Sequence, residues 1–271
     1  MPELPEVETV SRHLRPELVG ATITGFDALW HKVTAPSSAA AFAQKVLGRT
    51  ITDVRRRAKF ILLQLDVGLI HIHLRMTGRL FAGEPGLPEP RHLRARFTLS
   101  GDRDLYFTDA RKFGRIGYVP ALAALEARLG PEPLDEAFTP GRLYKMLRGH
   151  NRQIKPLLLD QAFIAGLGNI YVDEALHAAG IHPLTSSGRV VRAKAEKLHR
   201  AIRDILTAAI ASRGTTIMNY VDGEGQPGGY AVELKVFGRE GEACMTCGAT
   251  VVKTWVGQRG THFCPRCQRR R

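Results

Sequence analysis

The four cysteines constrain this chain more than any other feature, because all of them lie close to its C-terminal end. They form two Cys-x-x-Cys pairs, Cys244 with Cys247 and Cys264 with Cys267, and sixteen residues separate the pairs. A disulfide framework spreads its cysteines through a secreted domain, whereas two such pairs supply the four thiolates of a tetrahedral zinc site. We therefore predict one structural zinc ion held by these residues, with redox-active or purely structural thiols as the alternatives.

The charge of the chain points to a polyanionic partner. Its 271 residues carry 39 Lys and Arg against 26 Asp and Glu, which gives a formal net charge of +13 and a pI near 10.0. This excess favours nucleic acid, with an anionic membrane surface as the second choice. Because the chain has neither a run of about eighteen apolar residues nor a signal-peptide pattern at its start, we expect a cytoplasmic protein that associates with the nucleoid when bound to DNA.

Hydrophobic periodicity predicts a β-rich first half. Val7, Val10 and Leu14 have helical spacing and predict an opening helix over 5–14. From about residue 21 to 119, short apolar alternations separated by turn residues predict an antiparallel β-sandwich or barrel. The clearest predicted strands cover 60–65, 69–74, 95–99 and 105–108.

After Pro120 the apolar period becomes 3.6 residues, which predicts a helical second half. The predicted helices cover 122–129, 139–147, 154–161, 171–179 and 190–212. A glycine-rich loop is expected over 222–229, and the cysteine-containing segment after Val232 is expected to form a β-hairpin. The chain is thus predicted to have an α+β fold.

The first residues offer a nucleophile. A small second residue such as Pro2 permits removal of Met1, which exposes a secondary amine. An α-amino group has a pKa of about 7.7–8.0, so much of it is close to deprotonation at neutral pH. Its attack on a sugar C1′ gives an iminium ion that acidifies the C2′ proton, and Glu3 could move the protons. The alternative is that Pro and Glu at these positions only begin a helix.

Three separated motifs resemble those of the formamidopyrimidine-DNA glycosylase family, and the likeness runs nearly end to end. The start Pro2-Glu3-Leu4-Pro5-Glu6-Val7-Glu8-Thr9 resembles the N-terminal signature of the family. The segment Gly166-Leu167-Gly168-Asn169-Ile170-Tyr171 is similar to its helix-two-turns-helix segment. The stretch 233–241, followed by the four cysteines, resembles its zinc finger.

The resemblance implies a bifunctional DNA glycosylase and abasic-site lyase of base excision repair. Such an enzyme excises oxidised purines, 8-oxoguanine and formamidopyrimidines, through a proline Schiff base followed by β,δ-elimination. The implied partner is damaged double-stranded DNA, the only implied cofactor is the structural zinc, and the protein is expected to be a monomer. Three domains are implied: a catalytic β-sandwich over 1–130, a helix-two-turns-helix DNA-binding domain over 131–232 and a zinc-finger β-hairpin over 233–271.

Catalytic roles follow from the resemblance for four residues. Pro2 would form the Schiff base, Glu3 would donate a proton, Lys59 would act in β-elimination and Arg259 would act in δ-elimination. Lys59 follows three consecutive arginines. Its alternative role is therefore that of a cation on an exposed strand edge, where charge discourages aggregation.

DNA contacts are also implied by the resemblance. Met76 would fill the void left by an extruded nucleotide, Arg111 would face the orphaned base and Phe113 would wedge into the stack, which offsets part of the cost of lost stacking. From sequence alone, Met76 and Phe113 would more often be core residues at strand ends. The implied phosphate contacts are His92, Lys155, Asn169 and Arg259.

Two other functions compete with this interpretation. The first is an endonuclease VIII-like glycosylase for oxidised pyrimidines, although that sister group usually has Gly in place of Leu4. The second is a non-catalytic, zinc-dependent DNA-binding protein, which the charge and the cysteines alone would support equally well. The binding interpretation leaves the Pro2-Glu3 start unexplained.

Overall fold

The structure is a computed structural model that describes residues 1–85, 89–216 and 226–270. The chain forms two compact units, with the bounds Met1–Arg128 plus Ser212–Gly229 and Leu129–Ala211 plus Tyr230–Arg271. Residues 212–229 therefore belong to the first unit, although they follow most of the second unit in the sequence. The division into three domains remains a prediction. Residues 222–225 of the loop predicted over 222–229 lie outside the described residues.

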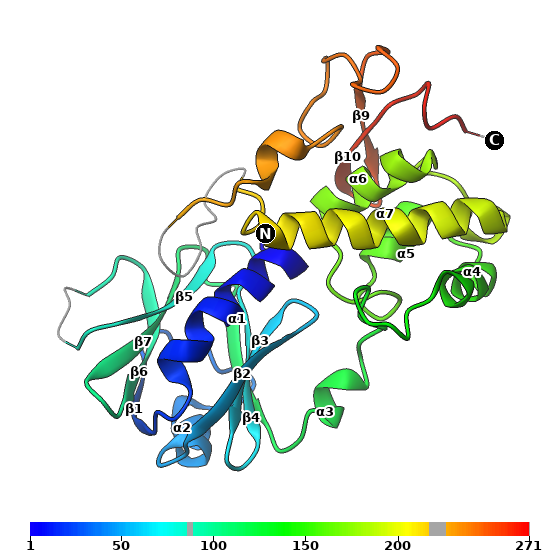
Figure 1. Ribbon diagram of the computed structural model, residues 1–271. Coiled ribbons are helices and arrows are strands. Elements are labelled where there is room, and N and C mark those ends of the chain that lie inside the picture. Colours follow the sequence, from blue (N-terminus) through cyan, green and yellow to red (C-terminus); the bar gives the residue numbers. More distant parts are fainter. Residues whose placement is uncertain (86–88, 217–225, 271) are drawn as a thin grey trace. The chain divides into compact units, whose positions relative to one another are not determined.

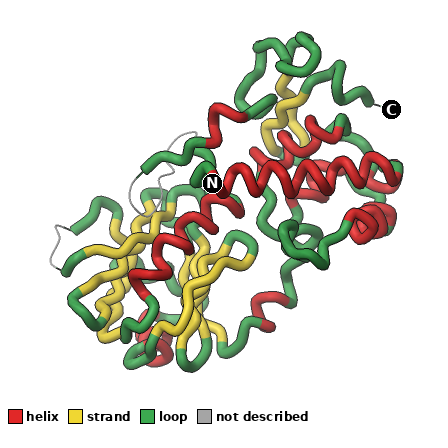
Figure 2. Tube along the Cα trace, viewed as in Figure 1, coloured by secondary structure: helices red, strands yellow, loops and turns green. Residues whose placement is uncertain are grey.

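Two four-stranded antiparallel sheets form the first unit, which confirms the predicted β-sandwich (Figures 1 and 2). The strands of one sheet, in spatial order, are β1 (Ile23–Ala28), β6 (Leu93–Leu99), β7 (Arg103–Asp109) and β5 (Gly78–Gly83). Those of the other are β2 (Ile51–Arg57), β3 (Phe60–Leu65), β4 (Leu69–His73) and β8 (Arg115–Val119). Buried side chains from both sheets, such as Phe97 and Ile72, share one hydrophobic core.

The opening helix α1 (Leu4–Leu18) completes that core. Val7, Val10 and Leu14 are buried in it, as their spacing predicts, and the helix continues beyond the predicted end to bury Leu18 as well. The helix contacts β2 and β3 of one sheet and β5 of the other. Its N-terminal residues are therefore held in a fixed place against the sandwich.

Two helices of the first unit differ from the predictions. Helix α2 (Ala39–Val46) interrupts a stretch that was predicted to contain only strands, and it buries only Phe42 and Val46. The Ser38 side chain caps it by accepting a hydrogen bond from the Ala41 backbone N–H at 3.1 Å. The helix predicted over 122–129 is reduced to α3 (Ala123–Glu126), which has no buried residue to stabilise it.

Helices make up most of the second unit, as the 3.6-residue period predicts. They are α4 (Pro140–Arg148), α5 (Ile154–Leu159), α6 (Asn169–Ala179) and α7 (Arg192–Ala211), with the 3-10 helices η1 (Ser187–Arg189) and η2 (Tyr230–Glu233). Helix α7 packs against α6 and α4, and it buries Leu198, Ile202 and Leu206 at a spacing of four residues. Within the described ranges, no helix is long and apolar enough to cross a membrane.

The predicted C-terminal hairpin is formed by β9 (Val252–Val256) and β10 (Arg259–Phe263). Between them Gly257 and Gln258 have positive φ angles of 55° and 62°, as a two-residue type I′ turn requires. The turn forms the tip at one end of the hairpin, and the two cysteine pairs flank the other end of the hairpin. Among the described residues, Val236 and Val251 form one buried cluster with Cys244 and Cys264.

Candidate functional site

The N-terminal residues Pro2 and Glu3 are both buried, and Glu3 is the N-cap residue of α1. The Glu3 backbone N–H donates to Glu6 Oε2 at 2.7 Å. The other carboxylate oxygen of Glu6 accepts from the Thr215 backbone N–H at 2.8 Å. Glu6 therefore joins the segment that carries the candidate nucleophile to the returning segment of the same unit. Sequence reasoning did not assign this role to Glu6.

Gly214 is required for the approach of these two segments. Its φ is +86°, a conformation that favours glycine, and a Cβ at this position would lie 2.8 Å from Glu6 Oε1. Any larger residue would push the returning chain away from the carboxylate. The glycine thus allows the hydrogen bond between Glu6 and Thr215.

Lys59 occupies the tight turn between β2 and β3 and is buried. The preceding Ala58 has a φ of 53°, as the first position of a two-residue type II′ hairpin turn requires. Strand β2 is tied to α1 by an ion pair of 3.0 Å between Arg56 Nε and Glu8 Oε2. The turn that carries Lys59 and the helix that begins after Glu3 therefore belong to one packed assembly.

His73 at the end of β4 remains neutral in this environment. Burial, together with the positive charges of Arg75 and Lys59, lowers the pKa of His73 to about 3. Its Nδ1 atom accepts a hydrogen bond from the Arg75 backbone N–H at 3.0 Å, as a neutral imidazole can. The charge next to Lys59 is therefore not increased by His73 at physiological pH.

The structure brings Met76, Arg111 and Phe113 together on the surface of the first unit. Arg111 Nη1 lies 3.0 Å from Met76 Sδ, and the Arg111 guanidinium carbon lies 4.7 Å from the centre of the Phe113 ring. Met76 is 41% exposed and Phe113 is 46% exposed, so neither is a core residue. Two exposed apolar side chains around one cation can contact the bases of a nucleic acid.

Asp109 organises this trio, although sequence reasoning did not single it out. Its buried carboxylate accepts from the backbone N–H groups of Arg111 at 3.1 Å, Phe113 at 2.7 Å and Gly114 at 2.7 Å. It also accepts from the hydroxyl of Thr77, the residue after Met76. The only sequence signal was an Asp at the end of a strand, where it favours a turn.

The predicted phosphate contacts differ in exposure. His92 is exposed at the start of β6, and its carbonyl oxygen accepts from the Asp109 backbone N–H at 2.9 Å. Asn169 is half-buried at the first turn of α6, where its Nδ2 donates to the Gly260 carbonyl oxygen at 2.9 Å. Arg259 is exposed next to the hairpin tip. His92 and Arg259 are thus the more accessible of these candidates.

Lys155 is completely buried in the second unit. Its Nζ lies 2.7 Å from Asp173 Oδ1, and the two side chains are 0% and 1% exposed. Nζ also donates to the Gly260 carbonyl oxygen at 3.2 Å. In this structure the ammonium group therefore attaches β10 to α5 and α6, and a phosphate contact of Lys155 remains a prediction.

We expect Lys155→Met to lower the free energy of unfolding of the second unit by about 3–5 kcal/mol, because Asp173 would keep a buried charge without its counter-ion. Urea denaturation monitored by circular dichroism would measure the change. Arg152→Met is the matched control, since the Arg152–Asp160 pair is exposed and should contribute at most about 1 kcal/mol. Equal effects of the two substitutions would contradict a structural role for Lys155.

The four cysteine side chains form a cluster suited to zinc. Their Sγ atoms all lie within 4.8 Å of one another, with 3.9 Å between Cys244 and Cys267 and 3.4 Å between Cys247 and Cys264. Tetrahedral Zn–S bonds of about 2.3 Å require Sγ–Sγ distances of about 3.8 Å. The cluster is therefore the site of one structural zinc ion, and four thiolates leave no open position for water or substrate.

Two adjacent acidic residues of α6 attach the zinc module to the helices. Asp173 Oδ2 accepts from the His262 backbone N–H at 2.8 Å. Glu174 accepts from three consecutive backbone N–H groups, those of residues 235, 236 and 237, at 2.8–2.9 Å. His177 of the same helix brings its Nε2 atom to 3.5 Å from Cys244 Sγ. A pair of acidic residues in an otherwise apolar helix was the only sequence signal for this attachment.

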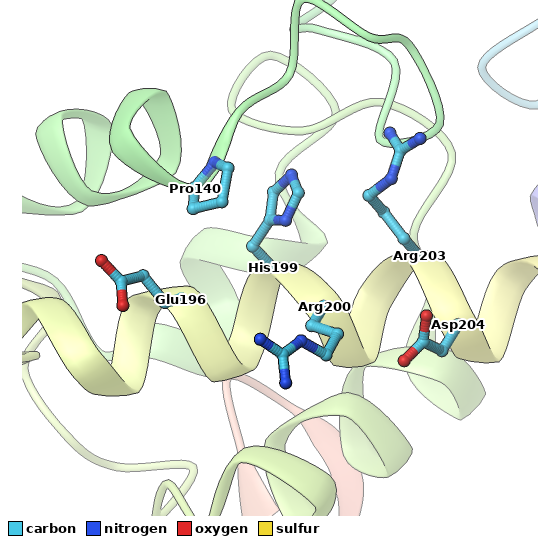
Figure 3. A pocket seen from close by; sticks show the side chains of 6 residues that line it. All are labelled: Pro140, Glu196, His199, Arg200, Arg203 and Asp204. Carbon is cyan, nitrogen blue, oxygen red and sulfur yellow. The ribbon is translucent and has the colours of Figure 1, made fainter.

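A cavity of about 380 Å³ lies away from all of these residues, on α7 of the second unit (Figure 3). It is lined by Pro140, Glu196, His199, Arg200, Arg203 and Asp204. His199 and Arg203 project toward the loop before α4, where His199 Nε2 contacts the Phe138 carbonyl oxygen and Arg203 donates to the Asp135 carbonyl oxygen. These contacts support the loop, and none of the predicted site residues lines this cavity.

Three family models match the chain in sequence order. The formamidopyrimidine-DNA glycosylase N-terminal domain matches residues 1–116, and the formamidopyrimidine-DNA glycosylase H2TH domain matches residues 129–220. The zinc finger found in FPG and IleRS matches residues 241–270. The last of these models contains all four cysteines of the cluster.

Full-length relatives and solved structures agree with these matches. A formamidopyrimidine-DNA glycosylase from Pelotomaculum thermopropionicum is 46% identical over 274 residues, with 99% of each chain covered. One from Chloroflexus aurantiacus is 47% identical over 272 residues and covers 99% of this chain and 98% of that protein.

Among solved structures, the complex of Lactococcus lactis FPG (MutM) with DNA that contains FAPY-dG has a TM-score of 0.91 at 36% identity, covering 99% of this chain and 100% of that chain. A structure of MutM in complex with DNA that contains carbocyclic 8-oxo-G has a TM-score of 0.92 at the same 36% identity and the same coverage. Sequence and fold therefore agree over the whole length. The chain belongs to the formamidopyrimidine-DNA glycosylase family.

Proposed function

We propose that this protein is a DNA glycosylase and abasic-site lyase that removes oxidised purines from damaged double-stranded DNA in base excision repair. The observation that carries the proposal is the combination, in one unit, of the Pro2-Glu3 start with the exposed trio Met76, Arg111 and Phe113. Full-length similarity to glycosylases of this name supports the same function. The solved structures of relatives contain DNA with FAPY-dG, with carbocyclic 8-oxo-G or with an abasic site, which correspond to the substrates and the intermediate expected of such an enzyme.

The nucleophile in this mechanism is the nitrogen of Pro2 after removal of Met1. Its lone pair attacks C1′ of the damaged nucleotide, the glycosidic bond breaks and the base leaves with its bonding electrons, which a proton neutralises. Opening of the sugar gives an iminium ion between Pro2 and C1′. Glu3, at the N-cap of α1, is the proposed proton donor in these steps.

Two eliminations follow from the iminium ion. In the first, a base takes the C2′ proton, the C3′–O bond breaks and the 3′-phosphate leaves. In the second, a base takes the C4′ proton, the C5′–O bond breaks and the 5′-phosphate leaves, so the product is a one-nucleotide gap with phosphates on both sides. Lys59 is the proposed donor in the first elimination and Arg259 in the second. Because Lys59 is buried in a tight turn, its ammonium group would be held in place for a proton transfer.

The trio gives the protein a means to open the duplex. A damaged base must leave the stack to reach the nucleophile, and this costs a few kcal/mol. Met76 and Phe113 are proposed to fill the space, while Arg111 faces the orphaned base. The zinc ion, when bound, holds the hairpin that presents Arg259 to the DNA backbone, and it takes no part in the chemistry.

Excision assays on three duplexes would test this function. The duplexes contain 8-oxoguanine opposite cytosine, dihydrothymine opposite adenine, or no damage. We expect release of 8-oxoguanine together with 3′- and 5′-phosphate ends, and little reaction with the others. Preferential excision of dihydrothymine would assign the activity to oxidised pyrimidines. Tight binding without excision of either base would leave a DNA-binding protein without glycosylase activity.

A further inference from the structure

Trp255 of β9 is 72% exposed, although an indole ring is among the largest apolar groups in proteins. The other tryptophan, Trp30, is half-buried and lies beneath the Arg115 guanidinium, whose carbon is 4.9 Å from the ring centre. An aromatic side chain left uncovered on a strand of a metal-stabilised hairpin is a candidate contact for a partner.

The hairpin fixes the direction of the Trp255 side chain. Trp255 pairs across the hairpin with Gly260, which has no side chain to cover the indole. Lys253, two residues earlier on the same strand, shares the exposed face with Trp255. Neighbouring Val256 is buried on the opposite face. The exposed face therefore carries the indole ring beside Lys253, whose Nζ pairs with Glu240 Oε1 at 3.0 Å.

The hairpin that carries Trp255 also carries or contacts residues that the family resemblance assigns to the DNA backbone. The carbonyl oxygen of Gly260, the pairing partner of Trp255, accepts from Lys155 Nζ at 3.2 Å and from Asn169 Nδ2 at 2.9 Å. Arg259, the exposed residue next to Gly260, lies at the tip of the same hairpin. Arg259 pairs with Val256, so the side chains of Arg259 and Trp255 leave opposite faces of the same hairpin. A DNA groove that enclosed the hairpin tip would meet both side chains.

We propose that Trp255 is a DNA-contact residue whose indole packs against the sugar and base surface of a nucleotide in the bound duplex. The proposal rests on the proposed function, because it requires that DNA binds to this unit. The net charge of +13 favours DNA as the occupant over a second, equally positive copy of the chain. An indole side chain has only about two rotatable χ angles, so little side-chain freedom is lost when the ring makes contact.

Salt dependence distinguishes this contact from a phosphate contact. We expect Trp255→Ala to weaken binding to an 8-oxoguanine duplex about tenfold, as loss of an aromatic–base contact does. The slope of log K against log salt should stay unchanged, because no counter-ion is involved, whereas loss of a phosphate contact lowers it by about one. Trp255→Phe should restore most of the affinity. Met245→Ala is the matched control, because Met245 is 59% exposed in the same zinc module but lies at the cysteine end of it.

Fluorescence provides a direct test, since the chain has only two tryptophans. In the Trp30→Phe variant all tryptophan emission comes from Trp255. Addition of duplex DNA should shift this emission and protect it from acrylamide, with the same midpoint as the anisotropy of labelled DNA. In the Trp255→Phe variant, the remaining emission from Trp30 should not acquire this protection.

The outcomes distinguish the inference about Trp255 from the proposed function. DNA binding by anisotropy without any change in the emission or the quenching of Trp255 would overturn this inference and leave the proposed function intact. Absence of DNA binding would overturn both. Emission that depends on protein concentration in the absence of DNA would assign the face to contacts between copies of the chain and would also overturn the inference.

Discussion

Retention of Met1 is expected to abolish borohydride trapping of this protein on DNA that contains 8-oxoguanine. When Met1 is present, the Pro2 nitrogen belongs to a peptide bond, and its lone pair is delocalised and cannot attack C1′. We expect the yield of covalent complex to fall by more than about a thousandfold, as when a catalytic nucleophile is removed. The comparison requires two preparations of the same sequence, made with and without methionine aminopeptidase and distinguished by intact mass.

Pro2→Gly provides the intermediate case. Glycine at position 2 also permits removal of Met1, so this variant keeps an α-amine but loses the secondary amine and the rigid pyrrolidine ring of proline. Trapping should be reduced but still detectable. Equal trapping by the preparation that retains Met1 would contradict the mechanism. Mapping of the adduct to Lys59 would then identify a different nucleophile while the glycosylase family assignment stayed unchanged.

The fold was predictable where local periodicity and burial agree. The strand β6 alternates buried and half-buried residues along its whole length, and the prediction of an apolar alternation there was correct. Helix α2 was missed because an eight-residue helix with two buried side chains, Phe42 and Val46, has too short an apolar pattern to recognise within a β-rich region. Its capping residue Ser38 and its alanines were the available signals.

The exposed residues of the candidate site were predictable from the sequence, but the buried residues that support them were not. The resemblance singled out Met76, Arg111 and Phe113, and the structure places them together. Asp109 holds the backbone of this trio, and Glu174 holds the zinc module. Both carboxylates bind backbone N–H groups, and the sequence alone does not show which backbone groups will lie near a carboxylate. Glu174 accepts from backbone N–H groups about sixty residues away in the chain, and no local pattern reports a contact of that range.

Removal of zinc is the second change expected to have a large effect, and it acts on one module alone. The hairpin module has almost no hydrophobic core apart from its cysteines. Its folding must therefore draw on the metal-binding free energy, which for zinc-finger peptides is about 10–16 kcal/mol at neutral pH. The β-sandwich of the first unit has a core of its own and should stay folded.

We expect Cys264→Ser to lower the zinc content from one ion per chain and to weaken DNA binding at least about a hundredfold, or about 2.7 kcal/mol, because the hairpin would no longer present Arg259. Met245→Ala, between the first two cysteines, should keep its zinc and its affinity. Elemental analysis, a chromogenic zinc assay after thiol modification and DNA anisotropy would measure these quantities.

Wild-type protein that carries no zinc but contains two disulfides would contradict the structural zinc site and favour redox-active thiols. Full DNA affinity after zinc release would instead show that the helices of the second unit position the hairpin without the metal, through the carboxylates of Asp173 and Glu174.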